Sequence, residues 1–136
     1  MADPTQRHLP RPTPETAHFW NGTRLGELLL QKCDECGEIY FPPRPFCSRC
    51  SGRNVSIFAA SGRATLYSYV ISHIPAPGLE PPYSVAVVTL EEGPRLMTNI
   101  VGCDQTPEKL KLDMPLEVIF EAQNDEITLP FFKPMV

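Results

Sequence analysis

From residue 62 onward, apolar and polar positions alternate in the way that half-buried β-strands require. Residues 63–73 place Tyr67, Tyr69 and Ile71 on one face and Leu66, Ser68 and Val70 on the other. Four more strand-like runs follow at 83–90, 95–101, 116–121 and 127–132, and Pro130 marks the last one as an edge strand. Five strands predict a small closed Greek-key barrel of the OB type, because a sandwich needs about seven.

The first third of the chain has a different pattern. Residues 1–12 are polar and Pro-rich, so we expect a mobile arm without chemistry. Thr13 is a helix-capping residue and Pro14 suits the first helical position, which predicts a short helix that Gly22 ends. The leucine-rich run 26–32 leads directly into a cysteine, which favours a strand over a helix.

Four cysteines carry the strongest chemical signal. Cys33 and Cys36 are separated by two residues, ten residues follow, and Cys47 and Cys50 repeat the same spacing. Each pair can turn both sulfurs toward one centre, and Gly37 can adopt the positive φ that such a knuckle requires. Four thiolates on a short hairpin predict a tetrahedral zinc site with no open coordination position, and therefore a structural metal.

Other uses of these cysteines are weaker. Two disulfides would need an oxidising compartment, and a thioredoxin-like dithiol would need a βαβ unit that the pattern lacks. A single iron bound as in rubredoxin uses the same four ligands, so the sequence leaves iron open. We interpret the fifth cysteine, Cys103, as a half-buried apolar residue. No catalytic motif is present, and we expect a protein that is not itself an enzyme.

Composition and charge narrow the classes of partner. The 136 residues carry 12 basic and 16 acidic side chains, a net charge of −4, and residues 62–136 hold ten of the acids but only five bases. This acidity opposes binding to a phosphate backbone. No run approaches 18 apolar residues, and the N-terminus has no signal-peptide pattern, so we expect a cytoplasmic protein that binds no membrane.

The order of motifs over residues 14–134 resembles one family of small proteins. The motifs are Phe19-Trp20-Asn21-Gly22, the CDECG and CSRC knuckles, the segment 39–44, the strand beginning Gly62-Arg63-Ala64, the run 81–86 and the closing segment 129–134. This family has an N-terminal helix, a rubredoxin-like zinc ribbon and a C-terminal OB-fold, and it is associated with acyl-CoA metabolism. The family tends to have an Ile-Gly-Met turn where this chain has Leu112-Asp113-Met114, and Asp tolerates the left-handed conformation of glycine.

The resemblance implies a mainly β protein with a mobile arm (1–12), a helix and zinc ribbon (13–54) and a five-stranded OB-fold barrel (55–136). It further implies an accessory or scaffold subunit of a thiolase-fold or aldolase-type enzyme in lipid, steroid or polyketide metabolism, as a homodimer or in a heteromeric complex. The subunit would stabilise the complex, shape the channel for an acyl-CoA or bridge two enzymes. A nucleic-acid-binding module is the alternative, because zinc ribbons and OB-folds both commonly bind strands of nucleic acid.

Five residues are candidates for contact with CoA or a partner protein: Phe19, Trp20, Tyr40, Phe41 and Arg44. Aromatic side chains on a rigid platform often anchor interfaces. Arg44 lies on a stiff Pro-Pro-Arg-Pro segment and can bind a CoA phosphate or a partner carboxylate. The aromatic residues could equally close the seam between helix, ribbon and barrel, and Arg44 could be a solvated surface residue.

Overall fold

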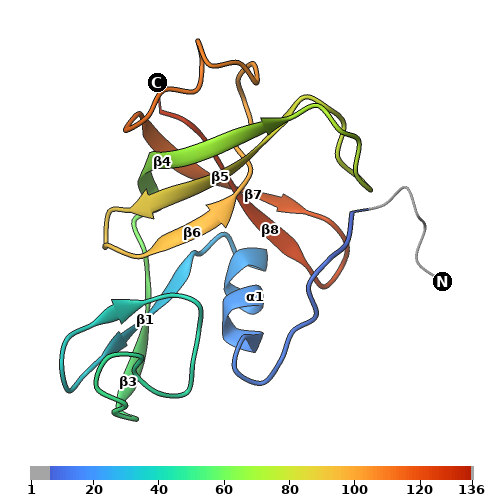
Figure 1. Cartoon of the computed structure of the whole chain (residues 1–136). Coiled ribbons are helices and arrows are strands. Elements are labelled where there is room, and N and C mark those ends of the chain that lie inside the picture. The colour runs from blue at the N-terminus through green and yellow to red at the C-terminus, as the bar shows by residue number, and fades with distance from the viewer. Residues whose placement is uncertain (1–6, 136) are drawn as a thin grey trace.

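The computed structural model describes residues 7–135 and consists of one short helix and two antiparallel sheets (Figure 1). A three-stranded sheet has the order β2-β1-β3, and a five-stranded sheet has the order β6-β5-β4-β7-β8. The mainly β class is therefore confirmed. The elements are α1 (Ala17–Arg24), β1 (Leu29–Cys33), β2 (Ile39–Tyr40), β3 (Val55–Ala59), β4 (Arg63–Ser72), β5 (Tyr83–Leu90), β6 (Arg95–Thr98), β7 (Pro115–Ala122) and β8 (Thr128–Pro134).

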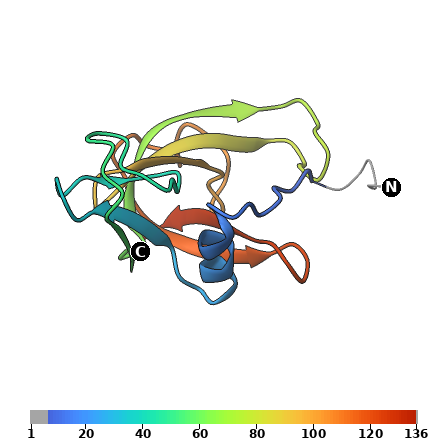
Figure 2. The same cartoon turned by 90° about the horizontal axis from the view of Figure 1, so that it is seen from below.

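The five-stranded sheet curls into an OB-fold half-barrel. Figure 2 shows β4 and β5 on one side and β7 and β8 on the other. A register shift between Leu66 and Ser68 marks a bulge in β4, which helps the strand to bend. The edge strands β6 and β8 approach each other at the parallel bridge from Ile100 to Phe132, and no ladder joins them over the described residues. The barrel is thus less fully closed than the sequence predicts.

The interior of the half-barrel is apolar and includes residues from the N-terminal part of the chain. Leu66, Val88, Leu116 and Phe132 are fully buried there. The same cluster contains side chains of α1 and of the segment that leads into the ribbon: Phe19, Leu28 and Leu30. Helix α1 contacts β1, β7 and β8 and so covers an opening of the half-barrel.

The helix begins and ends later than the sequence predicts. Thr13 starts a turn, since its carbonyl accepts the N–H groups of Thr16 and Ala17, and the helix itself begins at Ala17. Gly22 lies inside the helix instead of ending it. A Cβ at Gly22 would lie 2.7 Å from Leu29 Cδ1, so glycine allows β1 to approach closely. Gly26, at φ +78°, follows the helix end.

The sequence analysis missed two strands of the ribbon sheet, the two-residue β2 and the longer β3. β3 pairs with β1 in a register that sets Val55 opposite Cys33 and Ala59 opposite Leu29. Residues 55–59, which we had assigned to the barrel unit, therefore belong to the ribbon sheet. Residues 1–6 of the expected mobile arm lie outside the described residues, while Leu9 packs against the apolar cluster that includes Ile127. The division into arm, ribbon and barrel units remains a prediction.

The turn before β7 has the conformation expected for this chain. Asp113 has φ 67°, in the left-handed region that glycine adopts most easily. Its N–H donates to the carbonyl of Leu66 at 2.7 Å, which ties the turn to β4. Aspartate therefore keeps a turn in which the resembled family tends to have glycine.

Candidate metal centre and adjoining cleft

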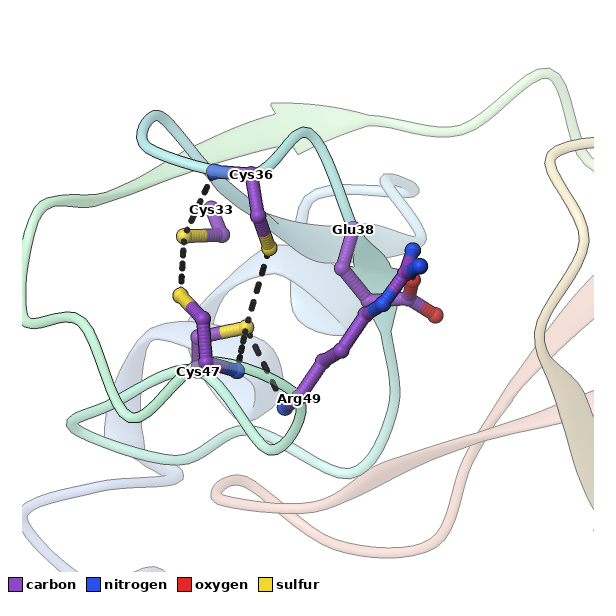
Figure 3. A network of polar contacts seen from close by, with 6 residues as sticks. Cys33, Cys36, Glu38, Cys47 and Arg49 are labelled. Carbon is purple, nitrogen blue, oxygen red and sulfur yellow. Dashed lines mark hydrogen bonds and ion pairs between the residues drawn. The ribbon is translucent and has the colours of Figure 1, made fainter.

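The four knuckle cysteines converge at one end of the three-stranded sheet. Their sulfur atoms all lie within 4.8 Å of one another. Two sulfur pairs, Cys33 with Cys50 and Cys36 with Cys47, are each 3.6 Å apart (Figure 3). A tetrahedral zinc with Zn–S distances of about 2.3 Å has neighbouring sulfurs about 3.8 Å apart. The four thiol groups therefore fit one tetrahedral metal ion.

The two knuckles have the same backbone design. In the first, Cys33 N–H donates to the Glu38 carbonyl and Gly37 N–H donates to the Cys33 carbonyl. The second knuckle contains the equivalent two bonds: Cys47 N–H donates to the Gly52 carbonyl, and Ser51 N–H donates to the Cys47 carbonyl. Gly37 has φ +80°, as its position in the knuckle predicts, and Ser51 occupies the equivalent position at φ 63°. The second knuckle thus places a non-glycine residue where glycine is favoured.

Backbone N–H groups point at the sulfurs. Cys36 N lies 3.4 Å from Cys33 Sγ, and Cys50 N and Arg49 N lie 3.5 Å and 3.3 Å from Cys47 Sγ. The bond from Cys50, followed by that from Arg49, lowers the pKa of the Cys47 thiol to about 7. Such bonds favour the thiolate form that binds a metal.

Burial of two of the cysteines and an ion pair between the knuckles hold the cysteine cluster in place. Cys33 and Cys47 are buried, and Arg49 forms an ion pair with Glu38 at 3.2 Å across the two knuckles (Figure 3). Four cysteine ligands fill a tetrahedral coordination shell, so a metal bound here has no position for a substrate. The arrangement can cross-link the ribbon, and Cys103 lies outside it.

The structure separates the candidate aromatic residues. Phe19 and Tyr40 are only 3% and 6% exposed, so they pack within the chain and offer little surface to a partner protein. Trp20 and Phe41 are half-buried. The rings of Phe19 and Trp20 meet edge to face at 4.9 Å, and Phe41 lies 5.2 Å from Phe19. The burial of Phe19 and Tyr40 fits the alternative interpretation, in which these residues close the seam between helix, ribbon and barrel.

Arg44 lies apart from this cluster. Its side chain is exposed, while its backbone N–H donates to Gln31 Oε1 at 2.7 Å and its carbonyl accepts the Tyr40 hydroxyl at 3.3 Å. The segment that carries Arg44 is therefore fixed even though the guanidinium is free to meet solvent.

An apolar cleft of about 230 Å³ lies beside the aromatic cluster. Phe19, Trp20 and Phe41 line one side, and Arg7 lies at the border. The remaining lining comes from the loop after β2 and from the two edge strands of the half-barrel: Pro42, Pro43, Leu96, Met97, Thr98, Leu129, Pro130 and Phe131, with Thr16 and Asn99. Sequence analysis missed Arg7 because its hydrogen bond to Asn99 joins residues 92 positions apart.

A four-cysteine ribbon fused to a five-stranded OB half-barrel defines the class of zinc-ribbon and OB-fold proteins. Two family models match the chain in this order: the ChsH2 rubredoxin-like zinc ribbon domain at residues 20–56 and the ChsH2 C-terminal OB-fold domain at residues 59–121. The chain belongs to this family, also called DUF35, as the resemblance indicated.

Some of the named relatives are called enzyme subunits and others are called scaffold proteins. A probable enoyl-CoA hydratase alpha subunit from Thermomonospora curvata is 36% identical and matches 93% of this chain but 40% of its own length. A DUF35 domain-containing scaffold protein from Methanothermobacter thermautotrophicus is 33% identical, over 82% of this chain and 86% of the relative. A benzoylsuccinyl-CoA thiolase subunit from Thauera aromatica is 29% identical, over 69% of this chain and 63% of the relative. This chain thus spans about two fifths of the hydratase subunit.

A solved structure titled as an Ltp2-ChsH2(DUF35) aldolase contains a chain with the same fold. It superposes with a TM-score of 0.84 at 35% identity, over 94% of this chain and all of that one. Within residues 7–135, no helix of this protein has the length and apolarity needed to cross a membrane.

Proposed function

We propose that this chain is a non-catalytic accessory or scaffold subunit that binds a thiolase-fold or aldolase-type enzyme of acyl-CoA metabolism. The observation that carries the proposal is the match to a whole chain of the Ltp2-ChsH2(DUF35) aldolase at 35% identity. Relatives named as a scaffold protein and as subunits of acyl-CoA hydratase and thiolase enzymes support the same role. We place this chain in a heteromeric complex with such an enzyme.

The chemistry of the described residues supports a non-catalytic role. The cysteine cluster offers a metal four protein ligands and no open position. Burial is the main cause that raises the pKa of the Cys103 thiol, and the reactive thiolate is thereby disfavoured. The chain's own contribution is then a rigid surface, built from a cross-linked ribbon and a half-barrel that share one apolar core.

The metal in this account is structural. We propose that Cys33, Cys36, Cys47 and Cys50 bind one Zn²⁺, which supplies a cross-link between the knuckles and takes no part in a reaction. Iron would use the same ligands, and the visible absorption of the purified protein distinguishes the two metals because zinc has a closed shell.

Arg44 is the candidate for direct contact with CoA or with the partner. Its guanidinium is exposed and its backbone is fixed through Gln31 and Tyr40. A fixed segment loses little entropy when its arginine binds a phosphate or a carboxylate. A charge-removing substitution, Arg44→Gln, is expected to weaken binding of CoA or of the partner enzyme without changing the fold.

Reconstitution tests the proposal. The tagged chain is co-expressed with thiolase-like, aldolase-like and hydratase-like proteins of its own genome, and the complexes are separated by size-exclusion chromatography. We expect a stoichiometric complex with an acyl-CoA enzyme, whose turnover falls when this chain is left out, while the chain alone turns over no acyl-CoA. Arg53→Gln, which removes an exposed arginine of the same ribbon, serves as a matched control for Arg44→Gln. Turnover by the isolated chain, or salt-sensitive oligonucleotide binding in place of a complex, would contradict the proposal.

A further inference from the structure

The apolar cleft lies where the half-barrel is open. Strand β8 meets the segment that follows β6 at one bridge, Ile100 to Phe132, and Thr98 at the end of β6 donates from Oγ1 to the Pro130 carbonyl at 3.1 Å. Residues of α1 and of the loop after β2 line the cleft together with residues of the two edge strands. The cleft is therefore walled by four separate elements, all of which the fold holds in place.

The lining is suited to an apolar group. Phe19, Trp20 and Phe41 form one wall, and Leu129 and Phe131 of β8 form another. Met97 stands at the rim with 72% of its surface exposed. The volume of about 230 Å³ lies below the range of about 300–1,000 Å³ typical of drug-sized ligand sites, so an occupant must be small.

Arg7 places one positive charge at the edge of this apolar space. Its Nη2 donates to Asn99 Oδ1 at 2.6 Å, and its guanidinium carbon lies 5.1 Å from the centre of the Phe131 ring. The ion pairs found among residues 7–135 join Arg49 to Glu38, Arg63 to Glu91 and Lys133 to Glu117. The half-buried charge of Arg7 thus has no carboxylate in contact with it in the described chain.

A half-buried positive charge that no carboxylate contacts favours the binding of an anionic ligand. Burial lowers the pKa of Arg7, with Glu121 acting in the opposite direction from beyond ion-pair distance. One hydrogen bond to Asn99 leaves other guanidinium donors for an oxygen ligand. An occupant with an apolar body and one carboxylate would match both the aromatic wall and this charge.

We propose that the cleft between α1, β6 and β8 binds a small amphipathic carboxylate, an alkyl or aryl acid whose apolar body lies against Trp20 and Phe41 and whose carboxylate meets Arg7. The site belongs to the isolated chain, and the proposal stands whether or not the partner enzyme is the one proposed above. Trp20 and Phe41 then line a ligand cleft within a single chain and do not form a surface for a partner protein.

The chain contains a single tryptophan, Trp20, and it lines the cleft, so its fluorescence reports occupancy directly. Octanoate and octanol are titrated into the zinc-loaded protein at pH 7 as a matched pair that differs in the charged group. We expect saturable shifts in emission, with octanoate bound about tenfold more tightly, the size of one charge-assisted hydrogen bond. Equal affinities would overturn the carboxylate assignment, and the absence of any saturable shift would overturn the site.

Three variants locate the binding. Arg7→Met should abolish the preference for octanoate over octanol while octanol still binds. Met97→Glu places a negative charge at the rim and should weaken octanoate more than octanol. Arg7 also lines a second cavity, with Tyr83 and Glu121, which Met97 does not line. Unchanged octanoate binding in Met97→Glu would therefore overturn the location.

Arg95→Met is the matched control. Arg95 also lies over an aromatic ring, 3.7 Å from the centre of Tyr67, but it does not line the cleft. The substitution removes the same charge from the same kind of contact, so octanoate binding should stay at the wild-type level. A loss equal to that in Arg7→Met would mean that net charge alone sets the affinity and would overturn the role of Arg7.

Discussion

The two sheets of this protein are stabilised in different ways. The half-barrel contains a core of side chains with no solvent exposure, among them Leu66, Val88, Leu116 and Phe132. The ribbon sheet is small, and the only side chains of its strands below one tenth exposure are Leu30, Gln31, Cys33 and Tyr40. A unit this small rarely folds on apolar burial alone, and we propose that a metal bound by the four cysteines at its end takes the place of a larger core.

The two regions are nevertheless joined. Leu28 and Leu30, which lead into and through β1, belong to the same apolar cluster as the barrel residues. The β1 strand therefore contacts the barrel core through Leu30 and ends at Cys33, one of the four proposed metal ligands. This shared strand makes the comparison testable, since loss of the metal and loss of the core should damage different ends of it.

The largest expected effect is that of metal removal. Structural zinc contributes about 10–16 kcal/mol of apparent binding free energy in zinc-finger peptides at pH 7. A strong chelator, or Cys47→Ala, should unfold residues 34–54 while the half-barrel persists. Hydrogen exchange measured by mass spectrometry would then show lost protection in β2 and the knuckles and retained protection in β5 and β7. Uniform loss of protection would show that the two regions do not differ in this way.

The core of the barrel gives the next largest effect. Phe132→Ala should reduce the free energy of unfolding by about 3–5 kcal/mol, the usual cost of an aromatic cavity. Ile119→Ala, at an exposed position of the neighbouring strand β7, is the matched control and should cost less than about 1 kcal/mol. Both are measured by denaturant unfolding of the zinc-loaded protein. Loss of zinc from the folded Phe132→Ala variant would contradict independent stabilisation of the ribbon.

How far the sequence predicts this structure depends on the range of the contacts. The cysteine cluster was predictable because CxxC spacing brings sulfurs together through local turns, and the barrel strands were predictable from alternation. β3 was missed because Val55–Ala59 is defined by its pairing with β1 and not by its own pattern. The cleft was not predictable, since Arg7, Phe41 and Phe131 meet only after both sheets have folded.

A substitution at Gly22 tests the packing of helix α1 against strand β1, where the two regions join. Alanine is the better helix former, yet its Cβ would lie 2.7 Å from Leu29 Cδ1 and 3.2 Å from the Glu27 carbonyl oxygen. We expect Gly22→Ala to destabilise the protein by about 1–3 kcal/mol through overpacking, against the helix propensity. Asn21→Ala, at an exposed position of the same helix, controls for propensity. A thermal melt in which Gly22→Ala gains stability would show that the seam is loosely packed.

The smallest effects come from two residues in the left-handed conformation, one in each region. Ser51→Gly in the second knuckle and Asp113→Gly before β7 should each stabilise the protein by about 0.5–1 kcal/mol, because glycine relieves the strain of φ 63° and φ 67°. After chelation, the gain from Ser51→Gly should disappear and that from Asp113→Gly should remain. Chemical denaturation with and without chelator measures both, and the reverse pattern would contradict the separation of the two regions.

The most direct test of the account is native mass spectrometry of the purified chain. We expect one zinc ion per chain, released when the four knuckle thiolates are protonated, with Cys103 unaffected by the release. A chain that carries no metal, yet keeps its ribbon protected from hydrogen exchange, would contradict the claim that a metal takes the place of a core.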